Sequence, residues 1–188
     1  MKKIILFFAA ALILYSASAQ WGVKAGANFS TLTGNQTGGL KHNTGVYGGV
    51  FYNARINGMF SFQPELVYSG QGAKVITAET WKLNYLNLTG LFRYNHTSGL
   101  FVGTGPQFGI LLSAKGKEGS SSVDMKDNFK STDISWAFAL GYEMKNGFGL
   151  YGRYNLGLSD INALGYGDKF KNSVIQVGLR YSFLSKNK

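Results

Sequence analysis

Apolar and polar residues alternate with a period of two over most of the chain after residue 20. In the clearest segment, residues 133–144, the even positions are all large and apolar, whereas the odd positions are small, polar or charged. A period of two is typical of a β-strand with two different faces. The chain is therefore predicted to form eight strands, in residues 20–32, 44–56, 60–69, 81–94, 100–113, 133–144, 148–159 and 172–183.

The links between these segments alternate in length. Short links rich in Asn and Gly are followed by longer links rich in Gly, Ser, Asn and Lys. The short links are 57–58, 95–98 and 145–147, and the long ones are 33–43, 71–80, 114–131 and 160–171. In an antiparallel meander the two kinds of link lie at opposite rims, which is the plan of an outer-membrane barrel. The prediction is an all-β, eight-stranded antiparallel up-and-down transmembrane β-barrel.

Large aromatic residues gather on one face of the strands, and Gly, Ser, Ala, Asn, Gln and single charges gather on the other. The interior of an eight-stranded barrel is narrow, so the aromatic face is predicted to point outward, into lipid. An ordinary soluble core with the aromatics inside is the alternative. The aromatics expected near the short-link rim, as a periplasmic girdle, are Trp21, Phe60, Tyr94, Tyr142, Phe148, Tyr181 and Phe183.

The pattern does not decide which face of the second strand, residues 44–56, points into the barrel. A two-residue turn at Asn57-Gly58 would place Val50 and Tyr52 on the face of Glu65, whereas a three-residue turn would place Phe51 and Arg55 there.

Residues 1–19 resemble an export signal. Lys2 and Lys3 precede an apolar stretch from Ile4 to Tyr15, and small residues end the segment at Ala19. The apolar stretch is shorter than the roughly 20 residues of a membrane-spanning helix. We expect cleavage after Ala19, a barrel domain over residues 20–184 and a tail over 185–188.

Composition narrows the function classes. The 188 residues include no cysteine, which excludes disulfides, thiolate metal sites, a cysteine nucleophile and a lipid-modified cysteine. Without Lys2 and Lys3, 17 Lys and Arg residues stand against 9 Asp and Glu residues, a net charge of +8. The basic residues form no run of the kind that marks a nucleic-acid tail, so nucleic acid is not an expected partner.

Three segments resemble those of small outer-membrane β-barrel domain ("porin family") proteins of Gram-negative bacteria, of the eight-stranded OmpA/OmpX-like type. These segments are 63–69 (QPELVYS), 153–161 (RYNLGLSDI) and 179–183 (LRYSF). The resemblance implies that the protein is inserted integrally in the outer membrane and that the barrel-assembly machinery recognises its last strand. Asn87 and Thr89 stand where the resemblance implies an acid and a proline, and residues 184–188 extend past the last aromatic.

No catalytic residue, cofactor or metal site is predicted. The two histidines, His42 and His96, fall at opposite rims on this topology and cannot share a metal ion or a proton. A lipid-modifying enzyme would have to use His42 with Ser30 or Thr44, but a solvated loop histidine is the commoner case.

Six charged residues are predicted to point into the barrel. They are Glu65, Arg93, Asp133, Glu143, Arg153 and Arg180, and Lys24 would join them if it also faces inward. Buried charges must pair, so a structural ion network is favoured over a solute constriction.

The longest link, 114–131, carries several lysines and acids and is a candidate contact for an extracellular ligand. Lys115, Lys117 and Lys130 lie where outer-leaflet phosphates would be, although a solvated face is the commoner case. The chain is interpreted as a non-enzymatic structural or surface-interaction protein whose partners are outer-membrane lipid and lipopolysaccharide. A narrow passive channel, a lipid-modifying barrel enzyme and a periplasmic lipocalin-like binder are the alternatives.

Overall fold

The computed structural model describes residues 20–35, 40–75, 80–118, 121–164 and 169–183. The expected signal peptide, residues 1–19, and the expected tail, residues 185–188, lie outside these ranges. Within the described ranges, no helix has the length and apolar character needed to cross a membrane.

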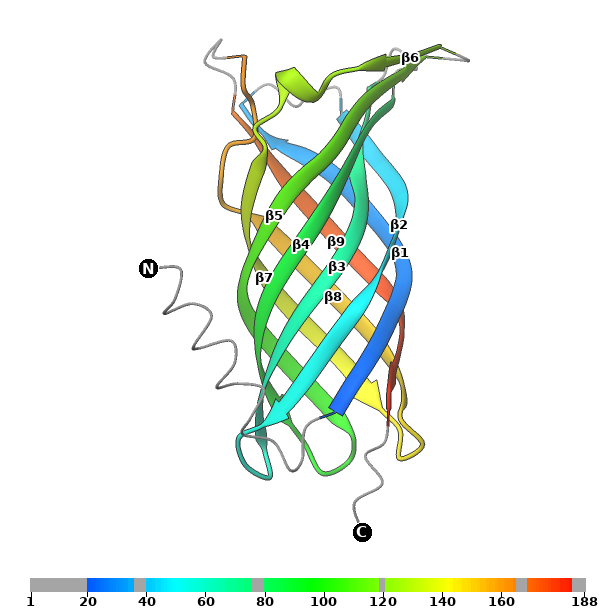
Figure 1. Cartoon of the computed structure of the whole chain (residues 1–188), viewed down its shortest axis with the longest axis vertical. Coiled ribbons are helices and arrows are strands. Elements are labelled where there is room, and N and C mark those ends of the chain that lie inside the picture. Colours follow the sequence, from blue (N-terminus) through cyan, green and yellow to red (C-terminus); the bar gives the residue numbers. More distant parts are fainter. Residues whose placement is uncertain (1–19, 36–39, 76–79, 119–120, 165–168, 184–188) are drawn as a thin grey trace.

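Eight long strands form one closed antiparallel barrel (Figure 1). They are β1 (Gln20–Gly34), β2 (Leu40–Arg55), β3 (Phe60–Val75), β4 (Thr80–Asn95), β5 (Leu100–Glu118), β7 (Thr132–Glu143), β8 (Phe148–Gly157) and β9 (Phe170–Ser182). Each strand pairs with the next along the chain, and β1 pairs with β9 from Gly22↔Ser182 to Gly34↔Phe170 to close the barrel. The predicted fold class is confirmed.

Short turns lie at one rim of the barrel and long connections at the other (Figure 1). The short turns are residues 56–59, 96–99 and 144–147. Gly99 and Gly147 have φ of 97° and 89°, a left-handed conformation that glycine adopts without steric cost. At the long-connection rim, a short strand β6 (Ser121–Asp124) pairs with the end of β5, and a 3₁₀ turn η1 (Lys126–Asn128) follows it.

The facing of β2 follows from the first turn. The Ile56 amide donates to the Phe60 carbonyl at 2.9 Å, which leaves three residues, 57–59, beyond the closing pair. Phe51 is therefore the partner of Glu65 in the neighbouring strand and points into the barrel. This is the facing expected for a three-residue turn.

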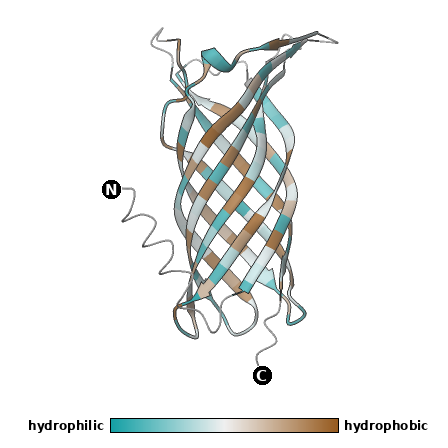
Figure 2. Ribbon diagram, in the orientation of Figure 1, coloured by the Kyte–Doolittle hydropathy of each residue, from teal (hydrophilic) through white to brown (hydrophobic). Residues whose placement is uncertain are grey.

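The large aromatic face points outward, so the inside-out arrangement is confirmed. Hydrophobic and paler or hydrophilic residues alternate along the strands of the wall (Figure 2). Outward aromatics such as Trp136 and Phe138 are 38% and 49% exposed, whereas Ser135 and Ala137 between and beside them are buried.

The expectation that the interior holds mainly small and polar residues is incomplete. Five aromatics also point inward and are buried, namely Tyr47, Phe51, Tyr85, Phe101 and Tyr151. Glycines on nearby strands make room for three of them. A Cβ on Gly22 would lie 2.1 Å from the Phe51 ring, one on Gly141 would lie 2.4 Å from the Phe101 ring, and one on Gly178 would lie 2.4 Å from the Tyr47 hydroxyl.

Candidate functional site: the barrel lumen and its two rims

The lumen contains a buried ion triad that joins three strands. The Glu65 carboxylate on β3 pairs with Lys24 on β1 and with Arg153 on β8, whose Nη2 lies 2.6 Å from Oε2. Gln63 donates to the other oxygen, Oε1, at 2.6 Å. Both carboxylate oxygens are therefore in use, and β1 and β8 are tied to β3 across the lumen.

A second triad lies beside the first. Glu143 accepts a hydrogen bond from Arg93 at 3.4 Å and forms an ion pair with Arg180 at 3.3 Å, and the Ser182 hydroxyl donates to its Oε1 at 3.0 Å. The Gln63 carbonyl oxygen accepts from both arginines, from Arg180 at 3.1 Å. Gln63 therefore connects the two triads into one network, which we call the ion belt: Lys24, Gln63, Glu65, Arg93, Glu143, Arg153 and Arg180.

The inward aromatics complete the environment of the cations. The guanidinium of Arg93 lies 3.8 Å from the Phe101 ring centroid, and that of Arg180 lies 4.2 Å from the Phe51 ring centroid. Cation–π contacts strengthen where the groups are buried, and Arg93 and Arg180 are both buried. The ion belt is thus packed against aromatic rings as well as paired internally.

Asp133, the sixth predicted interior charge, lies outside the ion belt. Its carboxylate accepts from Ser159 and from Asn172, each at 3.0 Å. Of the six predicted residues, the structure brings five together. It adds Lys24 and Gln63, so the ion belt holds four cations against two carboxylates rather than the expected balance of three and three.

Of the two added residues, Lys24 is predicted only on the condition that it faces inward, and Gln63 is not predicted. Gln63 stands two residues before Glu65 in a strand of clean alternation and so shares its face. Its role as the bridge depends on which strands become neighbours across the lumen, which alternation within a strand does not report.

Two clusters of buried apolar residues also occupy the lumen. The first is interleaved with the ion belt, because its Phe101 ring contacts Arg93 and its Tyr151 ring contacts Lys24 and Arg153. It consists of Tyr47, Val67, Leu91, Phe101, Ala137, Ala139 and Tyr151. A second lies at the mouth and consists of Leu32, Ala73, Leu83, Tyr85, Leu111, Ala114, Phe129 and Ile161. We call the second the mouth cluster.

Two long connections supply part of the mouth cluster. Phe129 and Ile161 come from the segments that follow η1 and β8. The Lys130 amide donates to the Ile161 carbonyl at 2.8 Å, and the Ala163 amide donates to the Asn128 carbonyl at 3.0 Å. These bonds hold the two connections together over the lumen.

The mouth at the opposite rim is hollow and polar. A cavity of about 370 Å³ there is lined by the short turns and ends at Arg93 and Glu143 of the ion belt. The hollow therefore stops at the first layer of interior charge.

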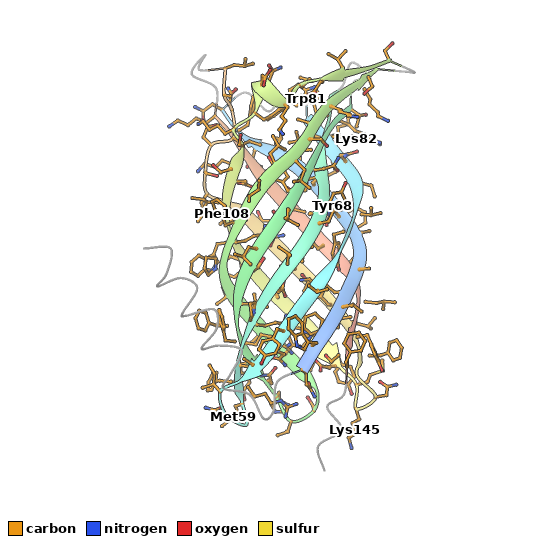
Figure 3. The ribbon with its side chains drawn as sticks, viewed as in Figure 1. Met59, Tyr68, Trp81, Lys82, Phe108 and Lys145 are labelled. Carbon is orange, nitrogen blue, oxygen red and sulfur yellow. The ribbon has the colours of Figure 1, made fainter. Side chains whose placement is uncertain are left out.

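The aromatics expected at the short-turn rim point outward and pack in cross-strand pairs. Ring centroids lie 5.5 Å apart for Phe60 and Tyr94 and 4.7 Å apart for Phe148 and Tyr181. Trp21 is 56% exposed. Figure 3 shows Met59 and Lys145 beyond these rings, at the tips of two short turns.

The residues considered for catalysis are not assembled into a site. His42 lies in β2 at the long-connection rim, and His96 lies in a short turn at the other rim. Ser30 faces the lumen and donates to the Gly72 carbonyl at 2.9 Å, whereas His42 is exposed. Among the described residues, no three His, Cys, Asp or Glu side chains are grouped as metal ligands.

Comparison with known proteins agrees with this architecture. None of the curated proteins compared matches the sequence. The structure resembles that of Ail, the attachment invasion locus protein of Yersinia pestis, with a TM-score of 0.51 and 14% identity over 88% of this chain and 99% of that one. It also resembles Neisserial surface protein A, NspA, with a TM-score of 0.54 and 17% identity over 88% and 99% of the two chains.

A further Ail structure, in complex with the heparin analogue sucrose octasulfate, has a TM-score of 0.50 and 14% identity over 88% and 99%. At these identities the likeness concerns the fold alone. The sequence itself matches the family described as outer membrane protein beta-barrel domain over residues 15–163. With a closed eight-stranded barrel and a match over most of its length, the chain belongs to the outer membrane protein β-barrel domain family.

Proposed function

We propose that this barrel is a non-conducting structural or surface-interaction protein of the outer membrane, without enzymatic activity. Residues 1–19 are removed on export, the short turns face the periplasm, and the long connections face the cell exterior, as in other outer-membrane barrels. Lipid and lipopolysaccharide surround the wall, and the barrel-assembly machinery inserts it.

The filled lumen is the observation that carries this proposal. The ion belt and the apolar cluster interleaved with it fill the lumen near the short-turn rim, and the mouth cluster fills it at the long-connection rim. Buried hydrogen-bonded residues such as Asn28 and Gln176 also face the lumen. A passing ion would have to separate Glu65 from Lys24 and Arg153, and breaking a buried ion pair costs roughly 3–5 kcal/mol. The wall therefore encloses a core rather than an aqueous bore.

The test is conductance of the folded barrel in a planar lipid bilayer. We expect no discrete steps from the wild-type barrel. A variant lacking residues 117–123, the tip of the β5–β6 hairpin, should also be silent, because the ion belt and both apolar clusters remain. Reproducible steps from the wild type would overturn the proposal in favour of a narrow passive channel.

The outward aromatics at the short-turn rim support the assigned orientation. On the proposed orientation, these rings lie on the outer wall at the level where lipid headgroups meet acyl chains. The residues are Trp21, Phe60, Tyr94, Tyr142, Phe148, Tyr181 and Phe183. Amphipathic rings are enriched at that depth in membrane proteins. We propose that they form the periplasmic girdle.

The extracellular contact proposed here is the β5–β6 hairpin. All four residues of β6 are exposed, and Lys115 and Lys117 project from the paired end of β5. A solved Ail structure holds the heparin analogue sucrose octasulfate, so a barrel of this fold can present a surface that holds a polyanion. Deleting residues 117–123 should leave a heat-modifiable barrel that has lost binding to sulfated polysaccharide. Unchanged binding would remove the hairpin from consideration.

The absence of enzymatic activity is proposed because no nucleophile is held by a base that is free to act. A nucleophile and its base must lie within hydrogen-bond reach. Ser30 donates to a backbone carbonyl inside the lumen, and His42 is exposed at the long-connection rim. At the other rim, the Ser98 hydroxyl lies 2.8 Å from His96 Nδ1, but the same nitrogen accepts from the Ser98 amide at 3.2 Å, within one exposed turn. Turnover of outer-membrane lipid by the wild type, lost in His42→Ala, would contradict this part.

A further inference from the structure

Two pairs of lysines face each other on the outer wall at the long-connection rim. Lys41 on β2 is the cross-strand partner of Lys74 on β3, and Lys82 on β4 is that of Lys115 on β5. All four are exposed, and Figure 3 shows Lys82 near this rim. We call them the lysine site. Like charges directly opposite on antiparallel strands repel, so such pairs destabilise a sheet that has no counter-charge.

The lysine site carries more positive charge than the acids beside it compensate. Asp124 on β6 is the second cross-strand partner of Lys115, but it forms no ion pair with it. The ion pairs of the described residues lie in the ion belt or join Lys130 to Asp160, and none includes these four lysines. Because their strands, β2 to β5, are consecutive in the wall, the outer face carries a net positive patch there.

Below the lysine site, the type of side chain on the outer face of the barrel changes from one cross-strand pair to the next. On the outer face of β4 and β5, the Lys82–Lys115 rung is followed by Asn84 and Ser113, joined by a hydrogen bond of 2.9 Å. The next rungs are apolar: Leu86 with Ile110, and Leu88 with Phe108. Figure 3 shows Phe108 on the wall below Lys82. The order is cationic, then hydrogen-bonding, then apolar.

The spacing along β4 gives the depth of the lysine site. Twelve residues separate Lys82 from Tyr94, which lies at the short-turn rim. With a rise of about 3.3 Å per residue and a strand tilt of about 40°, this corresponds to about 30 Å along the membrane normal. The apolar band of such barrels is about 25 Å tall. With Tyr94 at the periplasmic interface, Lys82 stands just beyond the acyl chains of the outer leaflet.

We propose that the lysine site binds the phosphate groups of a phosphorylated outer-leaflet lipid, whose acyl chains lie along the apolar rungs of β4 and β5. Each lysine pair offers ammonium donors to one phosphate, and the bound dianion replaces repulsion with attraction. Asn84 and Ser113 meet the polar linkage between phosphate and acyl chain. This inference rests on the proposed function for the orientation of the barrel and adds the partner and the place where it binds.

The site is one-sided, which distinguishes it from general attraction of a basic protein to an anionic membrane. At the closing seam, Lys171 on β9 faces Thr33 on β1, so no two lysines face each other in that strand pairing. A bound lipid should therefore occupy the β2–β5 wall.

The experiment compares lipid binding by matched charge variants in zwitterionic detergent. The variants are Lys82→Gln/Lys115→Gln and Lys41→Gln/Lys74→Gln, and the control is Lys126→Gln/Lys171→Gln, which removes two charges from the same rim outside the site. The probes are diphosphorylated lipopolysaccharide, the same lipid after phosphatase treatment, and inorganic phosphate.

We expect each site variant to bind the phosphorylated lipid about tenfold more weakly than the wild type, equivalent to about 1.4 kcal/mol. The control variant should bind it as the wild type does, and all four proteins should bind the dephosphorylated lipid equally and weakly. An equal loss in the control, or equal binding of both lipids by the wild type, would overturn the site. Inorganic phosphate that binds as tightly as the lipid would overturn the lipid as its source.

A second measurement, the unfolding temperature, tests the repulsion between the facing lysines. Without phosphorylated lipid, Lys41→Gln/Lys74→Gln should unfold at a temperature no lower than the wild type, because the like-charge pair is gone. With the lipid, the wild type should gain more stability than the variant. A variant that is less stable in both conditions would contradict the inference.

Failure of the lysine site is separable from failure of the proposed function. A barrel that shifts on heating in a gel and does not conduct, yet ignores the lipid phosphates, would overturn only the site. A wild type that conducts would overturn the proposed function whatever its lipid affinity.

Discussion

Glu65 is the counter-ion of two cations in the lumen, because its single carboxylate pairs with both of these fully buried side chains. Lys24, Glu65 and Arg153 have at most 2% of their side chains exposed. Desolvating such groups is expensive, and pairing offsets the expense only when every polar atom has a partner. With Lys24 and Arg153 on one oxygen and Gln63 on the other, the Glu65 carboxylate meets that condition.

Replacing Glu65 by glutamine should destabilise the barrel more than any other single loss of charge. Two buried cations would lose their counter-ion at once, so we expect a loss of roughly 3–5 kcal/mol in the free energy of unfolding. Urea unfolding of the folded barrel in detergent measures it. The matched control, Asp127→Asn on the exposed η1 turn, should stay within about 0.5 kcal/mol of the wild type. Equal stability of the two variants would contradict the role given to Glu65.

The residue types along each strand predicted which side chains point into the barrel, but not which other side chains they contact there. The alternation in residues 133–144 gives the facing of β7 correctly at every position, because one period governs the whole segment. In β2, the facing of Phe51 depends on whether the turn at Asn57-Gly58 has two or three residues, which the alternation within the strand does not report. The inward aromatics were underestimated because they need glycines on neighbouring strands, such as Gly141 beside Phe101, and that pairing exists only in the folded barrel.

At the scale of elements, one carboxylate holds the start of the connection after β8. The segment after β8 is fixed at Asp160, whose carboxylate accepts from Lys130 Nζ at 2.9 Å and from the backbone amides of Asn162 and Phe170 at 3.1 and 3.0 Å. Slight burial raises the pKa of Asp160, but the hydrogen bonds from Lys130 and the two amides outweigh it and leave the pKa below its ordinary value. The ionised carboxylate thus organises this part of the cover over the mouth cluster.

The mouth cover should therefore loosen in acid. Because the folded-state pKa of Asp160 is depressed, its stabilisation is complete above the ordinary aspartate pKa of about 3.9 and is lost as pH falls through the lower folded value. The probe is fluorescence of Trp81, which packs on Phe129 and Phe170, in a Trp21→Phe/Trp136→Phe background. A red shift is expected on acidification, at higher pH in Lys130→Gln and absent in Asp160→Asn. The same acid shift in Asp160→Asn would assign it to another group.

At the scale of the whole molecule, the barrel exists only when the two ends of the chain meet. The seam between β1 and β9 joins residues more than 130 positions apart, from Gly34↔Phe170 to Gly22↔Ser182. Such non-local pairing is entropically costly and forms late. The alternation in residues 172–183 predicted this closing strand, although the family match ends at residue 163. The sequence could not indicate which interior groups the closure brings together, since Lys24 and Arg153 approach Glu65 only across the completed lumen.

The end of the closing strand is where assembly should be most sensitive. The Phe183 amide donates to the Trp21 carbonyl at 2.7 Å, and its ring packs edge-on against Tyr181 at 5.4 Å. If the assembly machinery reads this outward aromatic, Phe183→Ala should lower the fraction of exported protein that becomes a heat-modifiable barrel in cells. The folded variant itself should lose only about 1 kcal/mol in detergent, the usual magnitude for an aromatic pair. Deletion of residues 184–188 keeps Phe183 and should assemble as the full chain does. A deletion that assembles poorly while Phe183→Ala assembles normally would place the signal in the tail and not in the last aromatic of the strand.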